Sequence, residues 1–171
     1  MLTATPSYDI RYTTALDAPS LKSWLEKPGM LHFFPISEEN EIENAVNSWI
    51  SFYKYKASLT ATIDGKPCGI ATLFLSPYRK VAHHSFFKII VDPQYQRQGV
   101  GASLLKNIKH LAKTLFRLDI IHIEIIEGNP IAHLLEKYQF ELFMRQERYF
   151  KEDGKYYARL LYKCYLSKEA S

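Results

Sequence analysis

One segment constrains the fold more than any other, because it joins a strand to a helix through a glycine-containing loop. A mostly apolar strand is expected at residues 86–91, and the loop Gln96-Arg97-Gln98-Gly99-Val100-Gly101 follows it. From residue 101 to 116, apolar residues recur at i, i+3 and i+4 on one stripe and lysines occupy the other faces, which is typical of a helix packed on a core. The segment predicts a fold in which strands and helices alternate.

The remaining segments extend this alternation over nearly the whole chain. Asp17 and Ser37 are suitable N-caps for two helices, the second with apolar residues at helical spacing through Tyr53. The Asp64-Gly65 and Asp153-Gly154 pairs predict tight hairpin turns. Further strands are expected at residues 9–12, 59–63, 68–75, 120–126, 140–150 and 156–166, and a short helix at residues 130–138. The order β-α-α-β-β-β-α-β-α-β-β predicts a mixed α/β fold, part antiparallel and part parallel.

Length and charge narrow the class of protein. The chain has 171 residues, 47% of them hydrophobic, which suffices for one well-filled core and is short for two, so we expect a single domain over residues 1–171. Its formal net charge of +4 comes from scattered residues rather than from a basic stripe, so nucleic-acid binding is not expected. A modest positive charge is compatible with a small ligand that carries several phosphates.

The cysteines and the N-terminus bear on the compartment. Cys68 and Cys164 form no C-x-x-C pair and lie in apolar, strand-like segments, which indicates buried thiols in a reducing compartment. Residues 1–6 lack a basic region followed by an apolar stretch, and no run of the sequence approaches the roughly 18 apolar residues of a membrane span. We therefore expect a soluble cytoplasmic protein without a membrane partner.

The glycine loop has the properties of a phosphate-binding site. Gly99, Gly101 and Ala102 let a ligand approach the backbone closely, and the first N–H groups of the following helix have no partner inside it. The helix dipole adds partial positive charge there, so main-chain donors can hold a pyrophosphate, with Arg97 and Ser103 able to assist. The alternative is that the glycines only start a helix. The spacing fits neither a P-loop nor a dinucleotide-binding fold.

These residues also carry a family resemblance. Val91-Asp92-Pro93 followed by Gln96-Arg97-Gln98-Gly99-Val100-Gly101 resembles the acetyl-CoA signature of the GNAT N-acetyltransferases, V-x-P and then Q/R-x-x-G-x-G/A at the start of a long helix. The element order extends the resemblance to an N-acetyltransferase-like region of about residues 9–167. The last third is most similar to bacterial small-molecule and amino-acid N-acetyltransferases, through residues 129–140 (N-x-x-A…K-x-G-F) and 153–156 (D-G-x-Y).

The resemblance implies acetyl-CoA as the acyl donor and a mostly antiparallel sheet, flanked by helices, with a central parallel strand pair that splays apart. Strand Ile89-Ile90-Val91 would splay from Ile123-Glu124-Ile125, and pantetheine would lie in the opening, bonded to the exposed backbone of the first strand. Asn129 would line the coenzyme arm, although Asn before Pro is also an ordinary helix start. The coenzyme-binding residues so implied are Ile89, Ile90, Val91, Gln96, Arg97, Gln98, Gly99, Val100, Gly101, Ala102, Ser103 and Asn129.

The candidate base lies on the strand opposite the pantetheine. Acyl transfer to an amine needs a group that takes a proton from the ammonium, and a donor that polarises the thioester carbonyl, for which a backbone N–H near Ile90 or Val91 suffices. Glu124 is the first candidate base; its alternative role is that of an ordinary solvent-facing strand residue. The other candidates are His122, Glu127, His83 and His84. The last two also fit a surface loop, and no metal site is expected because ligand spacing is lacking.

The expected acid departs from the family pattern. Many GNAT relatives carry L-Y-E-K-x-G-F, whose tyrosine faces the coenzyme sulfur, where this chain has Leu134-Leu135-Glu136-Lys137-Tyr138-Gln139-Phe140. Depending on the direction of counting, the tyrosine position is Leu135 or Glu136. Tyr138 can replace the acid, but on a helix it points about 60° away from Leu135 and can equally be a packing residue. The thiolate can also leave into water without an acid.

The expected acceptor is a primary amine of a small molecule, such as an amino acid or a polyamine. In this fold class acceptor contacts come largely from the segment between the first two helices, here with His32, Phe33 and Phe34, and from the final hairpin. The two phenylalanines can instead plug the core. The alternatives are a protein or peptide N-acetyltransferase and a non-catalytic acyl-CoA-binding module. A homodimer through strand edges or the last hairpin is compatible with the pattern.

Overall fold

The computed structural model describes residues 6–167, so most of the N-terminal segment considered for a targeting signal lies outside the described residues. The helices and strands are β1 (Tyr8–Tyr12), α1 (Ala18–Leu25), α2 (Glu39–Ile50), β2 (Ser58–Ile63), β3 (Lys66–Phe74), β4 (His84–Val91), α3 (Val100–Thr114), β5 (Ile120–Ile126), α4 (Ile131–Lys137), β6 (Glu141–Glu152) and β7 (Lys155–Tyr165). Short 3₁₀ helices lie between them: η1 (Ala15–Asp17), η2 (Met30–Phe33), η3 (Ser51–Tyr55), η4 (Arg79–Val81) and η5 (Pro93–Tyr95). This order confirms the predicted alternation.

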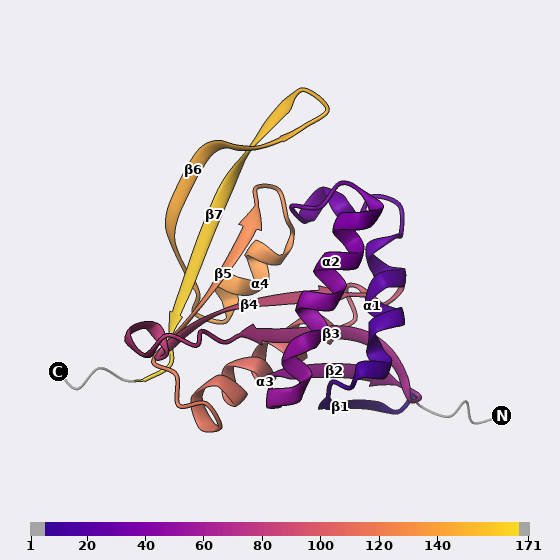
Figure 1. Cartoon of the computed structure of the whole chain (residues 1–171), viewed down its shortest axis with the longest axis vertical. Helices are drawn as coiled ribbons and strands as arrows, with labels where there is room; N and C mark the ends of the chain where they lie inside the picture. Colours follow the sequence, from indigo (N-terminus) through magenta and orange to yellow (C-terminus); the bar gives the residue numbers. More distant parts are fainter. Residues whose placement is uncertain (1–5, 168–171) are drawn as a thin grey trace.

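The strands form one sheet of seven, in the order β1-β2-β3-β4-β5-β7-β6 (Figure 1). Every neighbouring pair is antiparallel except β4 and β5, which are parallel. Their pairing runs only from His84↔Ile120 to Phe86↔His122, so the second half of β4 has no partner on that side. The predicted splayed parallel pair is therefore confirmed, and it opens the sheet at its centre.

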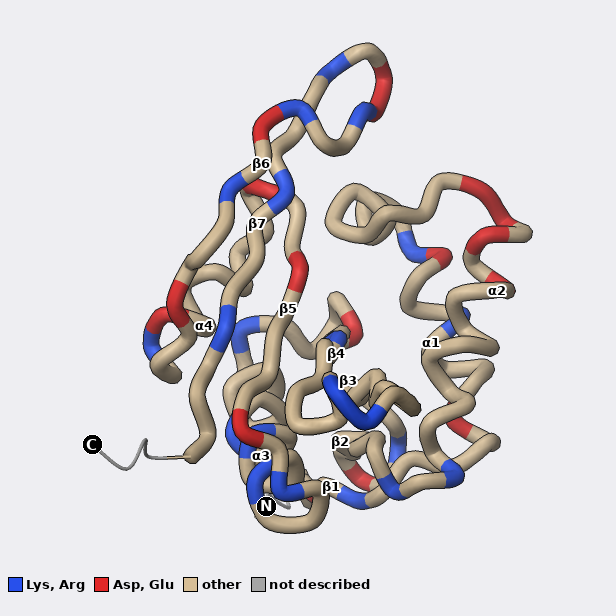
Figure 2. The backbone as a smooth tube through the Cα atoms, turned by 60° about the vertical axis from the view of Figure 1, so that its left-hand side comes forward, with Lys and Arg blue, Asp and Glu red and all other residues tan. Residues whose placement is uncertain are grey.

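The last two strands form a long hairpin that extends beyond the rest of the molecule (Figure 1). Its turn, Asp153-Gly154, has positive φ at both residues, 49° and 78°, as a type I′ turn requires. Glu residues are interspersed with Arg and Lys along β6, whereas the charged residues of β7 are all Lys or Arg (Figure 2). Glu127, just beyond β5, holds the hairpin to the sheet: its Oε1 accepts a hydrogen bond from the N–H of Ala158 and its Oε2 one from Arg145, both at 2.7 Å.

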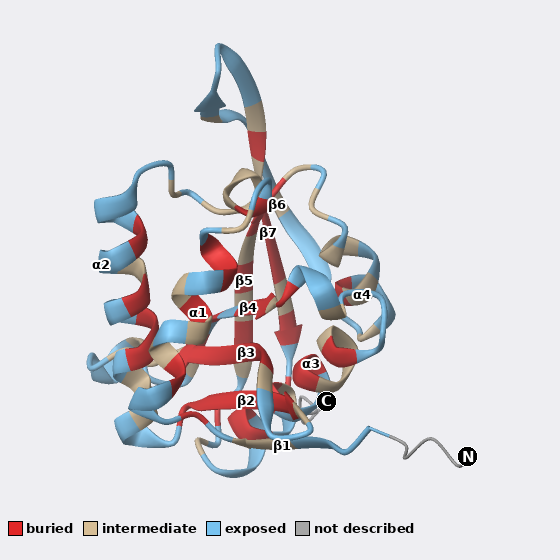
Figure 3. Cartoon of the chain, turned by 90° about the vertical axis from the view of Figure 1, so that its right-hand side faces the viewer, coloured by how far each residue is buried: buried red, intermediate tan, exposed pale blue. Residues whose placement is uncertain are grey.

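Two hydrophobic clusters bury the two faces of the sheet (Figure 3). Helices α3 and α4 cover one face, with Leu104 and Leu135 fully buried, and α1 and α2 cover the other, where Trp49 is the largest buried side chain. Gly69 sets the approach of α3, because a Cβ there would lie 2.8 Å from Leu104 Cδ1 and 3.1 Å from the carbonyl oxygen of Ile90. The absence of a side chain at Gly69 therefore lets the start of α3 pack closely on the sheet beside β4.

Some predicted helix boundaries were wrong. Glu38, not Ser37, is the N-cap of α2. The carboxylate of Glu41 accepts hydrogen bonds from the N–H groups of both Ser37 and Glu38, so the helix starts one residue later than predicted. The α-helix ends at Ile50, and a 3₁₀ helix carries the chain on to Tyr55.

Asp17 occupies the N-cap of α1 as predicted, but its carboxylate bonds to Arg11, Thr14 and Thr60 rather than to that helix.

In the described part of the chain, no helix combines the length and apolar character that crossing a bilayer would need.

Candidate active site

The loop before α3 presents unpaired main-chain donors. Gly99 is the N-cap with φ of 85°, a left-handed conformation that favours glycine, and Arg97 just before it is also left-handed, at φ 63°. The first bond to the Gly99 carbonyl comes from the N–H of Ser103, at 3.0 Å. The four N–H groups from Gly99 to Ala102 therefore have no partner inside the helix, and the positive end of its dipole lies with them. These free N–H groups are the main-chain donors on which the predicted anion site depends.

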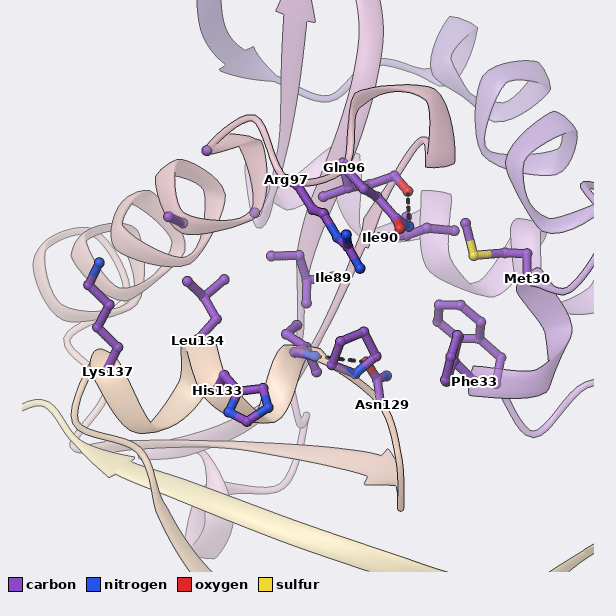
Figure 4. A pocket seen from close by; sticks show the side chains of 17 residues that line it. Met30, Phe33, Ile89, Ile90, Gln96, Arg97, Asn129, His133, Leu134 and Lys137 are labelled. Carbon is purple, nitrogen blue, oxygen red and sulfur yellow. Dashed lines mark hydrogen bonds between the residues drawn. The ribbon is translucent and has the colours of Figure 1, made fainter.

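A cavity of about 470 Å³ begins at this loop and follows the open edge of β4 to the start of α4 (Figure 4). Nine of the twelve residues predicted to bind coenzyme line it: Ile89, Ile90, Val91, Gln96, Arg97, Gly99, Gly101, Ala102 and Asn129. We call it the coenzyme pocket. Its shape, with an anion site at one end and unpaired strand backbone along one wall, suits a long ligand that carries phosphates.

Three predicted coenzyme residues do not line this pocket. Val100 is buried in the core under α3, so only its backbone faces the anion site. The side-chain Nε2 of Gln98 donates back to the Gln94 carbonyl at 3.3 Å. Ser103 has both backbone groups engaged, its N–H with Gly99 and its carbonyl with Asn107 Nδ2. The side chains of these three residues therefore form no part of the pocket wall.

Helix α4 adds pocket residues that the sequence reasoning missed. His133 and Lys137 are spaced i, i+4 and line the coenzyme pocket with Leu134, while Arg97 enters from the opposite loop (Figure 4). Their i, i+4 spacing after Asn129 is the sequence feature that places both side chains on one face of this helix. The pocket therefore has basic side chains on two of its walls, which suits several phosphates.

Asn129 lies at the start of α4 and at the wall of the pocket. Its Oδ1 accepts a hydrogen bond from the N–H of Ile131 at 3.0 Å, as expected of an ordinary helix start before Pro130. It also lines the coenzyme pocket and a second cavity beside it. The helix-start interpretation is correct, and it places this amide where the two cavities meet.

The second cavity has a volume of about 310 Å³ and lies against the α1 and α2 side of the splayed strands. It shares five wall residues with the coenzyme pocket, Phe33, Phe34, Ile89, Asn129 and Ile131. Its own walls are mostly aromatic and aliphatic, with two charged residues, Lys88 and Glu124. We call it the acceptor pocket. A ligand here would touch one in the coenzyme pocket at the edge of β4.

The side chain of Glu124 lies on the face of β5 that borders the acceptor pocket. Its Oε2 accepts a hydrogen bond from Arg159 Nε at 2.6 Å, and both side chains are more than two-thirds buried. Among the described residues, the other carboxylate oxygen, Oε1, takes no hydrogen bond. Glu124 is thus an oriented carboxylate with one acceptor atom free, beside an apolar cavity.

The other candidate bases lie elsewhere. His122 packs against His84, Phe86 and Phe143, and its buried Nδ1 has no partner within residues 6–167. Desolvation, together with the nearby His84 and Lys163, lowers the pKa of His122. Neither it nor His83 and His84 line either pocket. Both oxygens of Glu127 are engaged with the hairpin.

Tyr138 does not reach the coenzyme pocket, in contrast to its predicted role as the acid. Helix α4 ends at Lys137, and Tyr138 packs half-buried against the main core while its carbonyl accepts a hydrogen bond from Lys109 at 2.8 Å. Leu135 is fully buried and Glu136 is exposed. No tyrosine lines either pocket in the described part of the chain. The alternative, a packing tyrosine, matches the structure.

Two of the three predicted acceptor residues line the acceptor pocket. Phe33 and Phe34 do, so they do not merely plug the core. His32 turns away: its Nδ1 lies 3.2 Å from Glu152 Oε1 and its ring packs edge-on against Tyr157. His32 therefore ties this loop to the hairpin. Across residues 6–167, no group of three or more His, Cys, Asp or Glu is placed to hold a metal ion.

The model of the acetyltransferase (GNAT) family matches residues 13–140. No curated protein matches the chain in sequence. Among solved structures, yncA from Salmonella typhimurium, determined with its cofactor acetyl-CoA, superposes with a TM-score of 0.80 at 16% identity over 96% of each chain.

Two further structures show the same fold. The ribosomal-protein-alanine N-acetyltransferase of Brucella melitensis gives a TM-score of 0.76 at 20% identity, over 91% of this chain and 98% of that one. A GNAT-family acetyltransferase of Streptococcus pneumoniae gives 0.73 at 22% identity, over 94% of this chain and 100% of that one. The superposition on yncA covers 96% of this chain and so extends past residue 140, where the family match ends.

Proposed function

Because the chain belongs to the acetyltransferase (GNAT) family and uses acetyl-CoA as its acyl donor, we propose that it transfers the acetyl group to a primary amine of a small molecule. One observation carries the proposal: the coenzyme pocket and the acceptor pocket share a wall at the open edge of β4. A donor and an acceptor bound on the two sides of that wall would meet there.

The coenzyme pocket supports a specific placement of acetyl-CoA. The pyrophosphate takes hydrogen bonds from the free N–H groups at residues 99–102, and Arg97 and Lys137 neutralise its charge and that of the ribose phosphate. The pantetheine arm runs beside Ile89, Ile90 and Val91, whose backbone has no β5 partner. This directs the thioester towards Asn129 and the acceptor pocket.

The same geometry supports a reaction sequence. The carboxylate of Glu124 takes a proton from the bound ammonium, and the resulting amine attacks the thioester carbonyl carbon. A backbone N–H near Ile90 or Val91 stabilises the oxyanion. The C–S bond then breaks and the nitrogen releases its second proton to water as the amide forms. The coenzyme thiolate takes a proton from water, since no tyrosine lines either pocket within residues 6–167.

The walls of the acceptor pocket favour a small molecule over a peptide. The η2 loop supplies Phe33 and Phe34, and the contacts of His32 with Glu152 and Tyr157 tie that loop to the hairpin. A volume of about 310 Å³ is at the low end for small-molecule sites, which run to roughly 1,000 Å³. Transfer to a protein N-terminus, the activity named for the Brucella protein, is the competing function.

Thiol release from acetyl-CoA tests the proposal across amino acids, polyamines, aminoglycosides and short peptides. We expect at least one small amine to raise the rate well above the rate without acceptor. Calorimetric titration with acetyl-CoA serves as the companion measurement. Binding of acetyl-CoA without thiol release for any acceptor would point to a non-catalytic binding module, and release only with peptides would point to a protein acetyltransferase.

A further inference from the structure

Lys88 lies in the acceptor pocket and has no place in the reaction sequence above. It is in the second half of β4, on the same face as Ile90, and it lines the acceptor pocket but not the coenzyme pocket. Its Nζ lies 5.0 Å from the ring centre of Phe74 and 5.9 Å from that of Trp49. The ammonium is therefore held against two aromatic side chains at the wall of a cavity.

The strand register sets Lys88 opposite Glu124. Phe86 and His122 are the last paired residues of the parallel strands, so Lys88 and Glu124 lie two residues further along each strand, at the same level. Side chains alternate along a strand, which puts both on the face that borders the acceptor pocket. Because the strands splay here, the ammonium and the carboxylate stand on opposite sides of the opening.

The positive charge of Lys88 has no direct partner. Within residues 6–167, no carboxylate oxygen lies within 4.0 Å of it, and Glu124 is paired with Arg159 instead. Desolvation by the surrounding protein lowers the pKa of Lys88, and Glu124 opposes that shift. A cation that is partly desolvated and unpaired favours a bound anion and repels a second cation.

We propose that Lys88 binds a carboxylate of the acceptor, so that the acceptor is an amino acid rather than a polyamine or an aminoglycoside. This inference rests on the proposed function. The acceptor spans the opening, with its carboxylate at Lys88 and its ammonium at Glu124, and its side chain lies against the aromatic wall of Phe34 and Phe74. A ligand that carries only amino groups has no anion to pair with the Lys88 ammonium, so the two positive charges repel each other.

The experiment uses the 171-residue protein and compares three forms of each acceptor. Leucine and phenylalanine are assayed beside their amides and their decarboxylated amines, with spermidine as a polyamine. We expect the free acids to have the highest kcat/KM. Lys88→Gln should lower kcat/KM for the acids about 10- to 100-fold, mainly through KM, as expected for loss of a hydrogen bond between charged groups. The amides should change little, and Lys88→Arg should retain the preference for acids.

Lys163→Gln is the matched control. Lys163 also lies over two aromatic rings, those of Phe143 and Tyr165, but it lines neither pocket, so its loss should leave the preference unchanged. The KM for acetyl-CoA and the melting temperature of each variant show whether it is folded. Equal losses for acids and amides in Lys88→Gln, or wild-type preference for spermidine, would overturn the inference while leaving acetyl transfer intact. Absence of turnover with every amine would instead refute the proposed function.

Discussion

Arg159 donates from Nε to Oε2 of Glu124 at 2.6 Å, and this pair links the candidate base to the strand of the final hairpin. Glu124 pairs with Leu161 in the β5–β7 register, so Arg159 reaches it diagonally from two residues away. The guanidinium also lies over the ring of Tyr149, 4.8 Å from its centre. The hairpin therefore orients the carboxylate that borders the acceptor pocket.

Replacing Glu124 with Gln should lower kcat about 100-fold or more, because the amide keeps the size of the side chain but accepts no proton. The dissociation constant for acetyl-CoA should stay within about threefold, since Glu124 lines only the acceptor pocket. Steady-state thiol release and calorimetry measure the two effects.

Glu127→Gln is the control for that substitution. Glu127 is a carboxylate near the same strand, but both its oxygens bond to the hairpin, to Ala158 and Arg145. This variant should lose about 1–3 kcal/mol of stability and retain most of its kcat. A larger loss of kcat in Glu127→Gln than in Glu124→Gln would show that the base has been wrongly assigned.

The two glycines of the loop should respond differently to alanine. Gly99→Ala forces a side chain into the left-handed conformation, at a cost of about 1–2 kcal/mol, and should weaken acetyl-CoA binding about tenfold by moving the free N–H groups. Gly101→Ala places its Cβ 3.4 Å from Leu134 Cδ2 and 3.7 Å from Val91 Cγ2, which are ordinary contacts. Its affinity should stay within about threefold of wild type, because residue 101 has no positive φ and the family signature accepts Ala as well as Gly at this position. Calorimetry with acetyl-CoA compares them, and equal losses would contradict this account of the loop.

Local signals correctly predicted the turn from strand to helix at the glycine loop. Gly99 and Gly101 lie between a strand and a helix, and the conformation of that turn depends on residues adjacent in sequence. The tight turn at Asp153-Gly154 was predictable for the same reason. Such features require no knowledge of distant contacts.

Side-chain directions in the site were less predictable, because they depend on tertiary contacts. His32 adjoins Phe33 in sequence, yet it faces the hairpin more than a hundred residues away. The early end of α4 turns Tyr138 into the core. Lys88 gave no sequence signal, since only the splay of the strands places it across from Glu124.

The two cysteines should not react with thiol reagents in the folded protein. Burial, with a smaller contribution from the charge of Asp92, raises the pKa of Cys68 to about 11, and burial also raises the pKa of Cys164. At pH 8 only about one Cys68 thiol in a thousand is ionised, and the side chain is fully buried. We expect two thiols to react with a disulfide reagent only after denaturant is added. Rapid reaction without denaturant would show that the core around them opens.

The ion pair of Asp17 and Arg11 should make stability depend on pH. Burial alone raises the pKa of Asp17, but hydrogen bonds from Arg11, Thr14 and Thr60 and the charge of Arg11 outweigh it, so the pKa in the folded protein lies below its ordinary value. The contribution to stability is therefore complete above the unfolded pKa of about 4 and is lost as the pH falls through the folded pKa.

Asp17→Asn tests this dependence. The variant should be about 1–3 kcal/mol less stable than wild type at pH 7, and the difference should shrink as the pH falls below about 4. Urea unfolding at a series of pH values measures both proteins. A difference that stays constant down to pH 2 would show that the charge of Asp17 is not what stabilises this contact.

In the proposed reaction, a small amine receives the acetyl group at the junction of the two pockets. The most direct measurement is the mass spectrum of each candidate acceptor after incubation with acetyl-CoA and the protein. We predict one added acetyl group on the amine of a small molecule, at a rate that falls about 100-fold in Glu124→Gln. Unmodified small amines throughout, while acetyl-CoA still binds, would contradict the claim.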